Sequence, residues 1–451
     1  MSQPFQETIK GWNDLAEKVL EMARKRGLEA MLRLETSRRL KVRVRLGKLD
    51  ELSQTAPQNS VLKVFKGNRS VSGSTSKLTV EGLVALLDRL NQHVELVDED
   101  KAVGLPEPEW LVKKVPDLKL FDPAFLDFPV EKAKRMALEA EKAALDFDKR
   151  VTNSSGAGVG TSVYAACLYN TSGLKACEWG SSGSISVSPV AENEKGEKSS
   201  DSWFTWQRFE DSLEAPMTVG EMAAKRAVDG LGAGTAPTGK VPVLFAPETA
   251  TALLGHLWEC AAGDRVYKGS TYLTKAEKKA VASKLVTVVD DPLIPKGLNS
   301  TAFDGEGVAT RRRILVKDGV LQFHPCDCYS ARKLNRESTG HRSGGGVGSY
   351  NLYLENGEES PEQLLKKMGT GLFVTAFIGF GFNHATGDFS RGVRGFWVEE
   401  GKVVRPIQEV TVSGNLDEML KNVVAVGNDL CFRYGTDSPS LLVSEMTVSG
   451  S

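Results

Sequence analysis

The sequence predicts an α+β fold with two domains: an N-terminal domain of helices on a mostly antiparallel sheet, and a C-terminal strand-rich domain of barrel- or sandwich-like form. Three observations support this class. Helical and strand periods alternate in the first half, while short strands with glycine turns dominate the second. The length of 451 residues also exceeds the ~250–300 residues that one core usually spans. We expect the domains to cover residues 1–217 and 218–451.

The first elements show both periods. Apolar residues recur at helical spacing over residues 12–26, and Gly27 follows as a stop. In LKVRVRL, residues 40–46, apolar and charged residues alternate, which is the pattern of a half-buried strand. Gly47 makes the turn after this strand, and another short strand is expected within residues 61–78.

A second helix is expected over residues 80–96, with Thr79 as its cap. Residues 99–130 contain several prolines and no sustained period, so they form either a crossing segment within the first domain or a linker. The Ala- and Glu-rich residues 129–148 predict a long helix. Two strands separated by polar turns complete the first domain, over residues 161–179 and 182–192.

The second domain is expected to open with the helix MTVGEMAAKRAVDGLG, followed by the strand KVPVLFAP. From there to the C-terminus, short strands alternate with glycine turns. VKDGV at 316–320 and VEEGKVV at 398–404 place Asp-Gly or Glu-Gly at the centre of a hairpin. One helix interrupts the strands over residues 360–368, where Ser-Pro-Glu gives a capped start.

Composition excludes several classes of function. A net charge of -1 with 25% charged residues leaves no basic surplus for binding nucleic acid. No run of eighteen or more apolar residues occurs, and the N-terminus lacks the apolar core of a signal peptide. Six cysteines without regular spacing are typical of a reducing compartment. We therefore expect a soluble cytoplasmic protein that binds neither nucleic acid nor membrane.

One apolar helix raises the question of a zinc peptidase. TALLGHLWECAAGDR, residues 251–265, places His256 and Glu259 on one face, with Cys260 next to Glu259. A zinc-peptidase helix needs two histidines about one turn apart, with a glutamate beside the first. One histidine cannot make that site, so the sequence favours a buried structural helix.

A second metal candidate is LQFHPCDCYSA. His324, Cys326 and Cys328 alternate, so on a strand they would share one face, and Cys431 or His384 would complete a tetrahedral site. A proline between the first two interrupts the strand, and cysteine is common as a small buried hydrophobe. The structural interpretation is favoured here too.

A cluster of acids, Asp290, Asp291, Asp304 and Glu306, is compatible with a cation site or with acid and base catalysis. Aspartate before proline or glycine also favours turns, and the spacing is not that of a Ca²⁺ loop. Turn residues are therefore the preferred interpretation.

Two further segments combine polar residues with glycine. STGHRSGGGVG, residues 338–348, holds His341 and Arg342 and leads into a strand rather than a helix, which argues against a phosphate loop. A mobile loop, or one whose backbone approaches a peptide, fits better. Residues 383–401 gather His384, Asp388, Ser390 and Arg391, but lack the strained nucleophile turn of a serine hydrolase.

The order of these motifs resembles the TldD/PmbA family. The resemblance rests on VVDDPL, FDGEGVATRRR, TGDFSRGVRGFWVEEG and the closing SPSLLVSEMTVSG. It runs from about Glu29 to the C-terminus and is densest from 285 to 450. One branch of the family, TldD, carries an HExxxH zinc helix and a C-terminal cysteine ligand. The other, PmbA or TldE, lacks the zinc helix and pairs with the first, and TALLGHLWECAAGD resembles this second branch.

The resemblance implies a cytoplasmic heterodimeric metallopeptidase that degrades or matures small unfolded peptides, a family also labelled as modulators of DNA gyrase. It implies zinc on a TldD-like HExxxH partner, and no metal ligand, cofactor or catalytic residue on this chain; a homodimer is the other possible assembly. A self-sufficient hydrolase with a Cys/His metal site, and an adaptor acting on gyrase or toxin systems, are the alternatives.

The resemblance also suggests residues that shape a substrate cleft or a subunit interface. They are Asp290, Asp291, Asp304, Glu306, Ser338, Thr339, Gly340, Gly387, Asp388 and Ser390.

Overall fold

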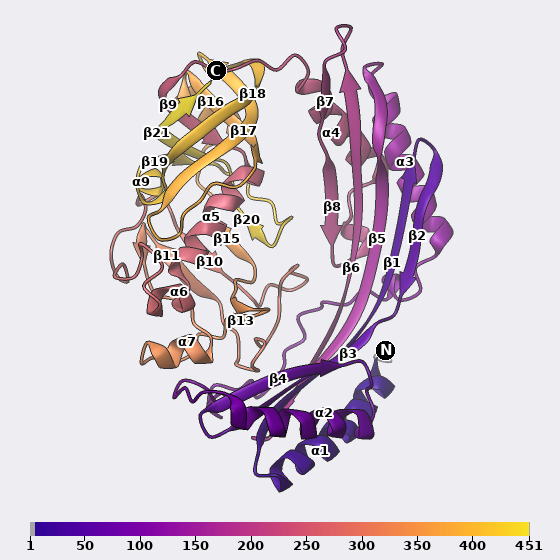
Figure 1. Ribbon diagram of the computed structural model, residues 1–451. Helices are drawn as coiled ribbons and strands as arrows, with labels where there is room; N and C mark the ends of the chain where they lie inside the picture. The colour runs from indigo at the N-terminus through magenta and orange to yellow at the C-terminus, as the bar shows by residue number, and fades with distance from the viewer. Residues whose placement is uncertain (1–4, 451) are drawn as a thin grey trace.

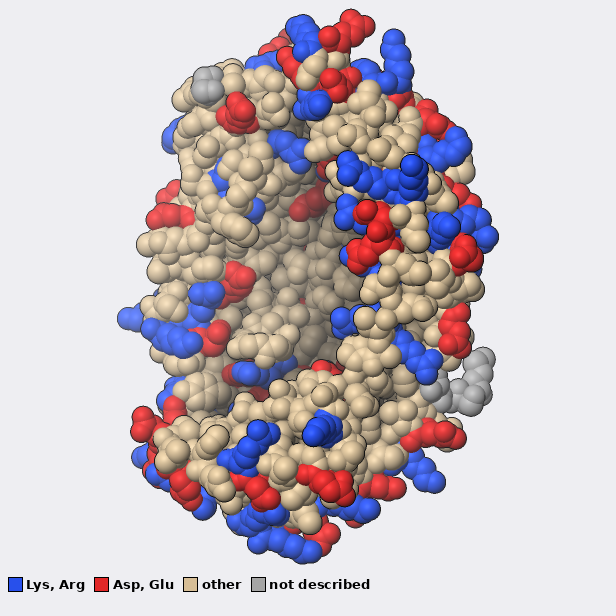
Figure 2. Space-filling view, turned by 45° about the vertical axis from the view of Figure 1, so that its right-hand side comes forward, with Lys and Arg blue, Asp and Glu red and all other residues tan. Residues whose placement is uncertain are grey.

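The computed structural model describes residues 5–450, which form an N-terminal and a C-terminal domain that face each other (Figure 1). A deep hollow lies between them in the space-filling view (Figure 2). The class is α+β, as the sequence predicts.

The N-terminal domain is built on an antiparallel sheet of eight strands. Their order is β4-β3-β1-β5-β6-β7, with β2 paired to β1 and β8 paired to β6. The long hairpin of β5 and β6 forms the curved centre of this sheet (Figure 1). The strands are β1 (Glu29–Arg45), β2 (Lys48–Thr55), β3 (Gln58–Lys66), β4 (Arg69–Thr75), β5 (Val151–Asn170), β6 (Lys175–Glu192), β7 (Lys198–Ser200) and β8 (Trp203–Gln207).

Four helices bury the apolar side of this sheet, and one hydrophobic core joins them to it. α3 and α4 pack on the face turned away from the C-terminal domain, while α1 and α2 cover its lower end (Figure 1). The sequence predicts that α4 opens the second domain, but its apolar face is part of this N-terminal core. The predicted first helix, the Thr79 cap and the long Ala-rich helix are confirmed. The helices are α1 (Gln6–Lys25), α2 (Val80–His93), α3 (Val130–Asp146) and α4 (Pro216–Asp229), with short 3-10 turns at η1 (Val94–Leu96), η2 (Pro123–Phe125) and η3 (Glu210–Ser212).

The predicted strand over residues 161–179 is wrong in one respect, because the hairpin turn lies inside it, at residues 171–174. The Ser/Gly run that follows is part of β6. Ser181 is fully buried there, and its hydroxyl is satisfied because it donates to the Arg208 carbonyl and accepts from the Asp122 N–H. At Gly183 an added Cβ would lie 2.4 Å from the Phe125 ring. These small residues make room for packing, not for a turn.

The C-terminal domain contains a closed five-stranded barrel in the order β18-β17-β16-β9-β21, with β18 paired back to β21. β19 adds to β21, and a second sheet runs β12-β11-β10-β15-β20. The predicted barrel-like domain is therefore confirmed. The strands are β9 (Gly239–Phe245), β10 (Val288–Asp290), β11 (Arg313–Lys317), β12 (Val320–Leu321), β13 (Arg342–Ser343), β14 (Gly346–Val347), β15 (Leu352–Leu354), β16 (Gly371–Ile378), β17 (Asp388–Glu399), β18 (Lys402–Asn415), β19 (Val423–Val426), β20 (Thr436–Asp437) and β21 (Leu441–Ser449).

The two predicted hairpin turns form as expected. Asp318-Gly319 joins β11 to β12, Glu400-Gly401 joins β17 to β18, and all four residues have positive φ, which such tight turns require. α8 begins with the expected Ser360 cap. The helices of this domain are α5 (Pro247–Ala261), α6 (Gly263–Tyr267), α7 (Cys328–Lys333), α8 (Pro361–Met368) and α9 (Leu416–Lys421).

The segment 99–130 connects the domains by packing as well as by sequence. Leu105, Leu111 and Leu118 share a small hydrophobic cluster with Phe303 of the C-terminal domain. The backbone of Leu111 pairs with Val308. None of the helices within residues 5–450 is long and apolar enough to cross a membrane.

Candidate functional site

A cavity of about 560 Å³ lies where the two domains meet. One wall comes from β1, β3 and β4 of the N-terminal sheet, and the other from the loops around Asp304 and Arg342. Its volume falls within the range of small-ligand sites, roughly 300–1,000 Å³. The sequence-predicted Asp304 and Glu306 are part of its lining.

Asp304 holds the loop that forms one side of this cavity. Its Oδ1 accepts hydrogen bonds from the N–H groups of Glu306 and Val308, at 2.8 and 2.9 Å, and its Oδ2 accepts from the Arg342 N–H at 3.0 Å. Burial and the neighbouring Glu306 raise the pKa of Asp304 to about 8, against the opposing effect of the three N–H donors. The carboxyl therefore organises the backbone of two cavity segments.

Glu306 and Arg342 are each anchored to α7. Glu306 Oε2 accepts from the Cys328 N–H at 2.9 Å, in the first turn of that helix. Asp327 caps the same helix through Ser330 and pairs with the Arg342 guanidinium at 3.0 Å. A carboxylate and a guanidinium of the cavity lining are thus both anchored at the start of α7.

Lys63 lies on the opposite wall, from β3. Within residues 5–450, no carboxylate lies within ion-pair distance of its amine, and burial lowers the pKa of Lys63. Glu178, also in the lining, accepts a hydrogen bond from Thr301 at 2.7 Å, and burial raises its pKa. A ligand with charged ends would pair with both groups and so offset the cost of burying them.

Asp290, His341 and Thr339 form a chain of polar groups, in which Asp290 and His341 are buried and Thr339 is partly exposed. His341 Nε2 lies 3.2 Å from Asp290 Oδ2, and Thr339 Oγ1 lies 2.6 Å from His341 Nδ1. The order carboxylate, imidazole, hydroxyl is that of a nucleophilic triad. However, His341 and Asp290 are 1% and 0% exposed, and the Thr339 hydroxyl also accepts from the Cys326 N–H. The chain of groups therefore fixes the loop before β13 to β10, with its carboxylate and imidazole buried.

The remaining predicted residues have structural contacts. Asp291 Oδ1 accepts from the Leu293 N–H, which confirms the turn interpretation. Ser338 and Gly340 shape the tight turn before His341. The last group, Gly387, Asp388 and Ser390, lies apart from the cavity lining, at the start of β17.

Asp388 bonds with Thr386 and Asn415, and His384 bonds with neither Asp388 nor Ser390. The serine triad that the sequence disfavours is thus not assembled at these three residues.

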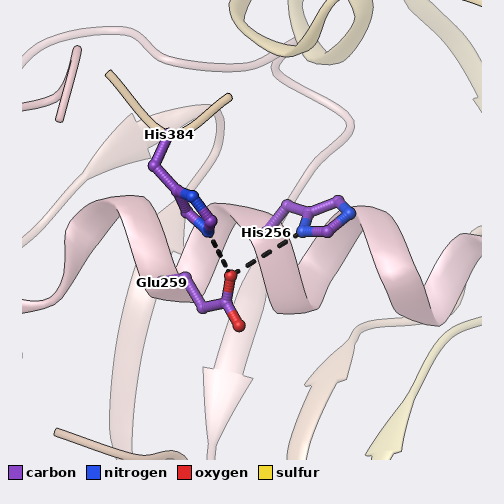
Figure 3. Close-up of side chains that lie close together, drawn as sticks. All are labelled: His256, Glu259 and His384. Carbon is purple, nitrogen blue, oxygen red and sulfur yellow. Dashed lines mark hydrogen bonds and ion pairs between the residues drawn. The ribbon is translucent and has the colours of Figure 1, made fainter. Parts of the chain in front are cut away.

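The structure instead brings His384 to the helix that the sequence analysis set aside. On α5, His256 Nδ1 lies 3.8 Å from Glu259 Oε2, and His384 Nε2 lies 2.5 Å from the same oxygen (Figure 3). The three ligand atoms lie within 4.8 Å of one another, the only such group of three His, Cys, Asp or Glu among the described residues. His256 and His384 lower the pKa of Glu259 to about 2, so the carboxylate is ionised.

The donor set of this His–Glu–His group fits a zinc ion. Two imidazole nitrogens and one carboxylate oxygen form a ligand set found in catalytic zinc sites that leave the fourth position open. The side chain of Glu259 is 50% exposed, so solvent reaches the group. The sequence shows one histidine on α5 because the second comes from 128 residues further along, on the loop before β17.

The metal site considered for His324, Cys326 and Cys328 is not formed in the described part of the chain, and the structural interpretation that the sequence favours is confirmed, because both cysteines are buried. His324, Cys326 and Cys328 do not converge: His324 Nδ1 bonds with the Ala261 carbonyl, and burial raises the pKa of Cys326 to about 12, so its thiol stays protonated. The residues between β12 and α7 are not a strand, so the expected shared face is absent. Cys328 begins α7 instead.

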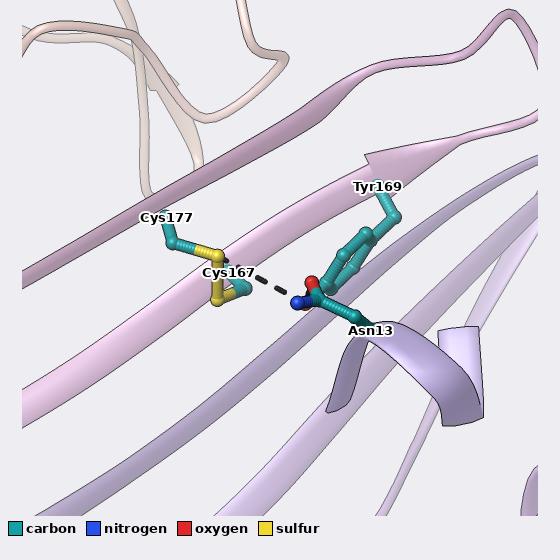
Figure 4. Close-up of a disulfide and its surroundings, with 4 residues drawn as sticks. All are labelled: Asn13, Cys167, Tyr169 and Cys177. Carbon is teal, nitrogen blue, oxygen red and sulfur yellow. Dashed lines mark hydrogen bonds between the residues drawn. A yellow bond between two sulfur atoms is a disulfide. The ribbon is translucent and has the colours of Figure 1, made fainter. Parts of the chain in front are cut away.

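Two cysteines expected as reduced thiols form a disulfide. Cys167 and Cys177 lie directly opposite each other in the β5–β6 ladder (Figure 4). Tyr169, on the same strand as Cys167, bonds to Asn13 of α1 at 3.0 Å. The sequence spacing of the cysteines did not reveal this pair because it depends on where the hairpin turns.

Comparison with known proteins gives consistent results. Residues 238–450 match the PmbA/TldA metallopeptidase C-terminal domain, and residues 123–231 match the PmbA/TldA metallopeptidase central domain. The chain is 36% identical to the Metalloprotease PmbA of Escherichia coli O157:H7, over 96% of this chain and 94% of the relative. It is 33% identical to the Metalloprotease PmbA homolog of Haemophilus influenzae, over 96% and 94% of the two chains.

Solved structures share the fold along the chain. A candidate modulator of DNA gyrase from Bacteroides thetaiotaomicron superposes with a TM-score of 0.91 at 27% identity, over 97% of this chain and 99% of that one. TldE from Thermococcus kodakarensis gives a TM-score of 0.88 at 22% identity, over 97% and 100%, which is a likeness of fold.

Proposed function

The chain belongs to the PmbA/TldA metallopeptidase family, and we propose that it is the subunit without an HExxxH helix in a two-subunit zinc metallopeptidase. The complex would act in the cytoplasm on small unfolded peptides, degrading or maturing them. Its partner would be a TldD-like chain that carries the HExxxH zinc site.

The observation that carries this proposal is the sequence of α5. Residues 247–261 read PETATALLGHLWECA, with a single histidine, in a chain that otherwise keeps the family fold. Zinc supplies a metallopeptidase with an activated water and a polarised carbonyl, and a free carboxylate must take the proton. In the His–Glu–His group, Glu259 would itself be a ligand, so it is not free to act as that base. Hydrolysis is therefore assigned to the partner.

The cavity between the domains supports a role in holding peptide. Lys63 and Arg342 offer positive charge, and Glu306 and Glu178 offer carboxyl groups within the same lining. A short peptide carries one charge of each sign at its ends, so it can pair with both kinds of group. The hollow between the two domains is open to solvent (Figure 2). Extended peptide in such a groove can also add to a strand edge.

The proposal is tested by purifying the chain alone and together with a TldD-like HExxxH protein from the same organism. We expect a stable complex that cleaves an unfolded peptide, loses activity with a chelator, and loses it when the HExxxH histidines of the partner are replaced. The lone chain should be inactive. Cleavage by the lone chain, or capture of gyrase with no HExxxH partner, would instead favour one of the alternative functions.

Replacing Lys63 tests the role of the cavity. Lys63→Ala should raise KM for peptide in the complex several-fold with little effect on the unfolding midpoint, because this amine has no carboxylate partner to lose. Lys66→Ala, on the same strand but exposed and paired with Glu95, is the matched control and should leave KM unchanged. Equal KM values for both variants would remove the cavity from peptide binding.

A further inference from the structure

We propose that His256, Glu259 and His384 form a binding site for one divalent transition-metal ion of the Zn²⁺ type on this chain itself. The site goes beyond the proposed function, which places the catalytic zinc on a partner, and it is tested on the lone chain. It is distinct from an HExxxH site, because its two ligands on α5 are a histidine and a glutamate, and its third ligand is a histidine from the loop before β17 (Figure 3).

The three ligand atoms are close enough that only small side-chain movements would let them hold an ion. Ligand atoms around a tetrahedral zinc with bonds of about 2.0–2.2 Å lie about 3.4 Å apart. His256 Nδ1 and Glu259 Oε2 are 3.8 Å apart, which is close to that value. His384 Nε2 and Glu259 Oε2, at 2.5 Å, would separate by about 1 Å, a shift that side-chain rotation can supply.

The loop that carries His384 is held in place by its own contacts. The His384 carbonyl accepts from the Tyr272 N–H at 3.2 Å. Gly387 N–H donates to the Asn383 carbonyl, which closes the turn around His384. Phe382 stacks on the His256 ring with centroids 4.2 Å apart. The ligands are therefore positioned before an ion arrives, which reduces the ordering cost of binding.

His256 lacks the partners that a half-buried imidazole normally has. Among the described residues, its Nε2 atom is buried without a hydrogen-bond partner, and its Nδ1 atom has only the 3.8 Å contact with Glu259. A cation between this ring and the carboxylate would bind Nδ1, the nitrogen that faces Glu259, and would neutralise that carboxylate.

The fourth position of such a site would face solvent. Glu259 is half exposed, and His256 and His384 are 21% and 26% exposed. Water or a ligand carboxylate could fill this position, as in open zinc sites.

Metal binding is measured on the full-length chain, purified without a polyhistidine tag, stripped with EDTA and then titrated with ZnCl₂ against a competing chromophoric chelator. All proteins carry Cys431→Ser, because Cys431 is an exposed free thiol and thiolates are zinc ligands. We expect about one zinc per chain by elemental analysis and a higher melting temperature with zinc. Co²⁺ should give visible d–d bands without a thiolate charge-transfer band.

The variants His256→Ala, Glu259→Gln and His384→Ala should each weaken zinc binding at least tenfold, since loss of even an outer partner costs 10–100-fold. His93→Ala, at the exposed C-terminal end of α2, is the control and should bind as the parent does. If His256→Ala fails to fold, His384→Ala on the surface loop still decides the question. No stoichiometric zinc, unchanged binding in His384→Ala, or a thiolate band with Co²⁺ would overturn the proposal.

Discussion

Gly340 shows how one residue determines the loop beside the cavity. Its φ of 74° is in the left-handed region, and an added Cβ would lie 2.8 Å from the Ala309 carbonyl oxygen. Gly340→Ala should therefore lower the free energy of unfolding by about 1–3 kcal/mol in a urea titration. Gly345→Ala, where a Cβ would meet no atom within 4 Å, should change it by less than about 0.5 kcal/mol. Equal effects would contradict this explanation.

The cysteines give a second prediction about single residues. With Cys167 and Cys177 joined, the chain unfolded without reductant should react with four equivalents of a thiol reagent, from Cys260, Cys326, Cys328 and Cys431. In the folded protein only Cys431 should react quickly, because the other three are buried. Six reactive thiols after unfolding would show that the pair is reduced.

At the level of helices and strands, local periodicity was sufficient to predict an element wherever that element buries one face. α1 and β1 follow the 3.6- and 2-residue periods, and Thr79 and Ser360 cap the helices they precede. The hairpin β5–β6 was misplaced because glycine and serine in a long strand look like turn residues. These small residues are needed for tertiary packing. Gly183 makes room for the Phe125 ring, which comes from a segment whose position sequence periodicity cannot predict.

The contact between α7 and the segment 99–130 is predicted to contribute to stability in a pH-dependent way. Asp100 accepts hydrogen bonds from Lys333 and Tyr329, at 2.8 and 2.6 Å, and these lower its pKa from 3.8 to about 2. Because the pKa is lower in the folded state, the contribution of the Asp100 carboxylate to stability is complete above about pH 4 and is lost as the pH falls towards 2.

Asp100→Asn should therefore lower the unfolding midpoint at pH 7, and its difference from the parent should shrink between pH 4 and pH 2. Asp98→Asn, two residues away and exposed, is the control and should match the parent at every pH. A difference that stays constant with pH would show that the Asp100 charge is not involved.

Across both domains, the fold class could be predicted from sequence, but the candidate site only in part. Asp304 and Glu306 do line the cavity, yet Lys63 and Glu178 are contributed by the other domain and carry no sequence signal. Glu259 and His384 are 125 residues apart and meet only because the loop before β17 folds back on α5. Contacts of this kind depend on tertiary packing that a single sequence does not display.

The cooperation of two subunits is measured by titrating this chain into a fixed concentration of the TldD-like HExxxH partner and following the hydrolysis of an unfolded peptide. We predict that the rate rises from near background to a plateau at one chain per partner. A metal chelator should abolish hydrolysis at every ratio of the two chains. A rate that is independent of this chain, or the same hydrolysis by this chain without the partner, would contradict the proposed division of roles.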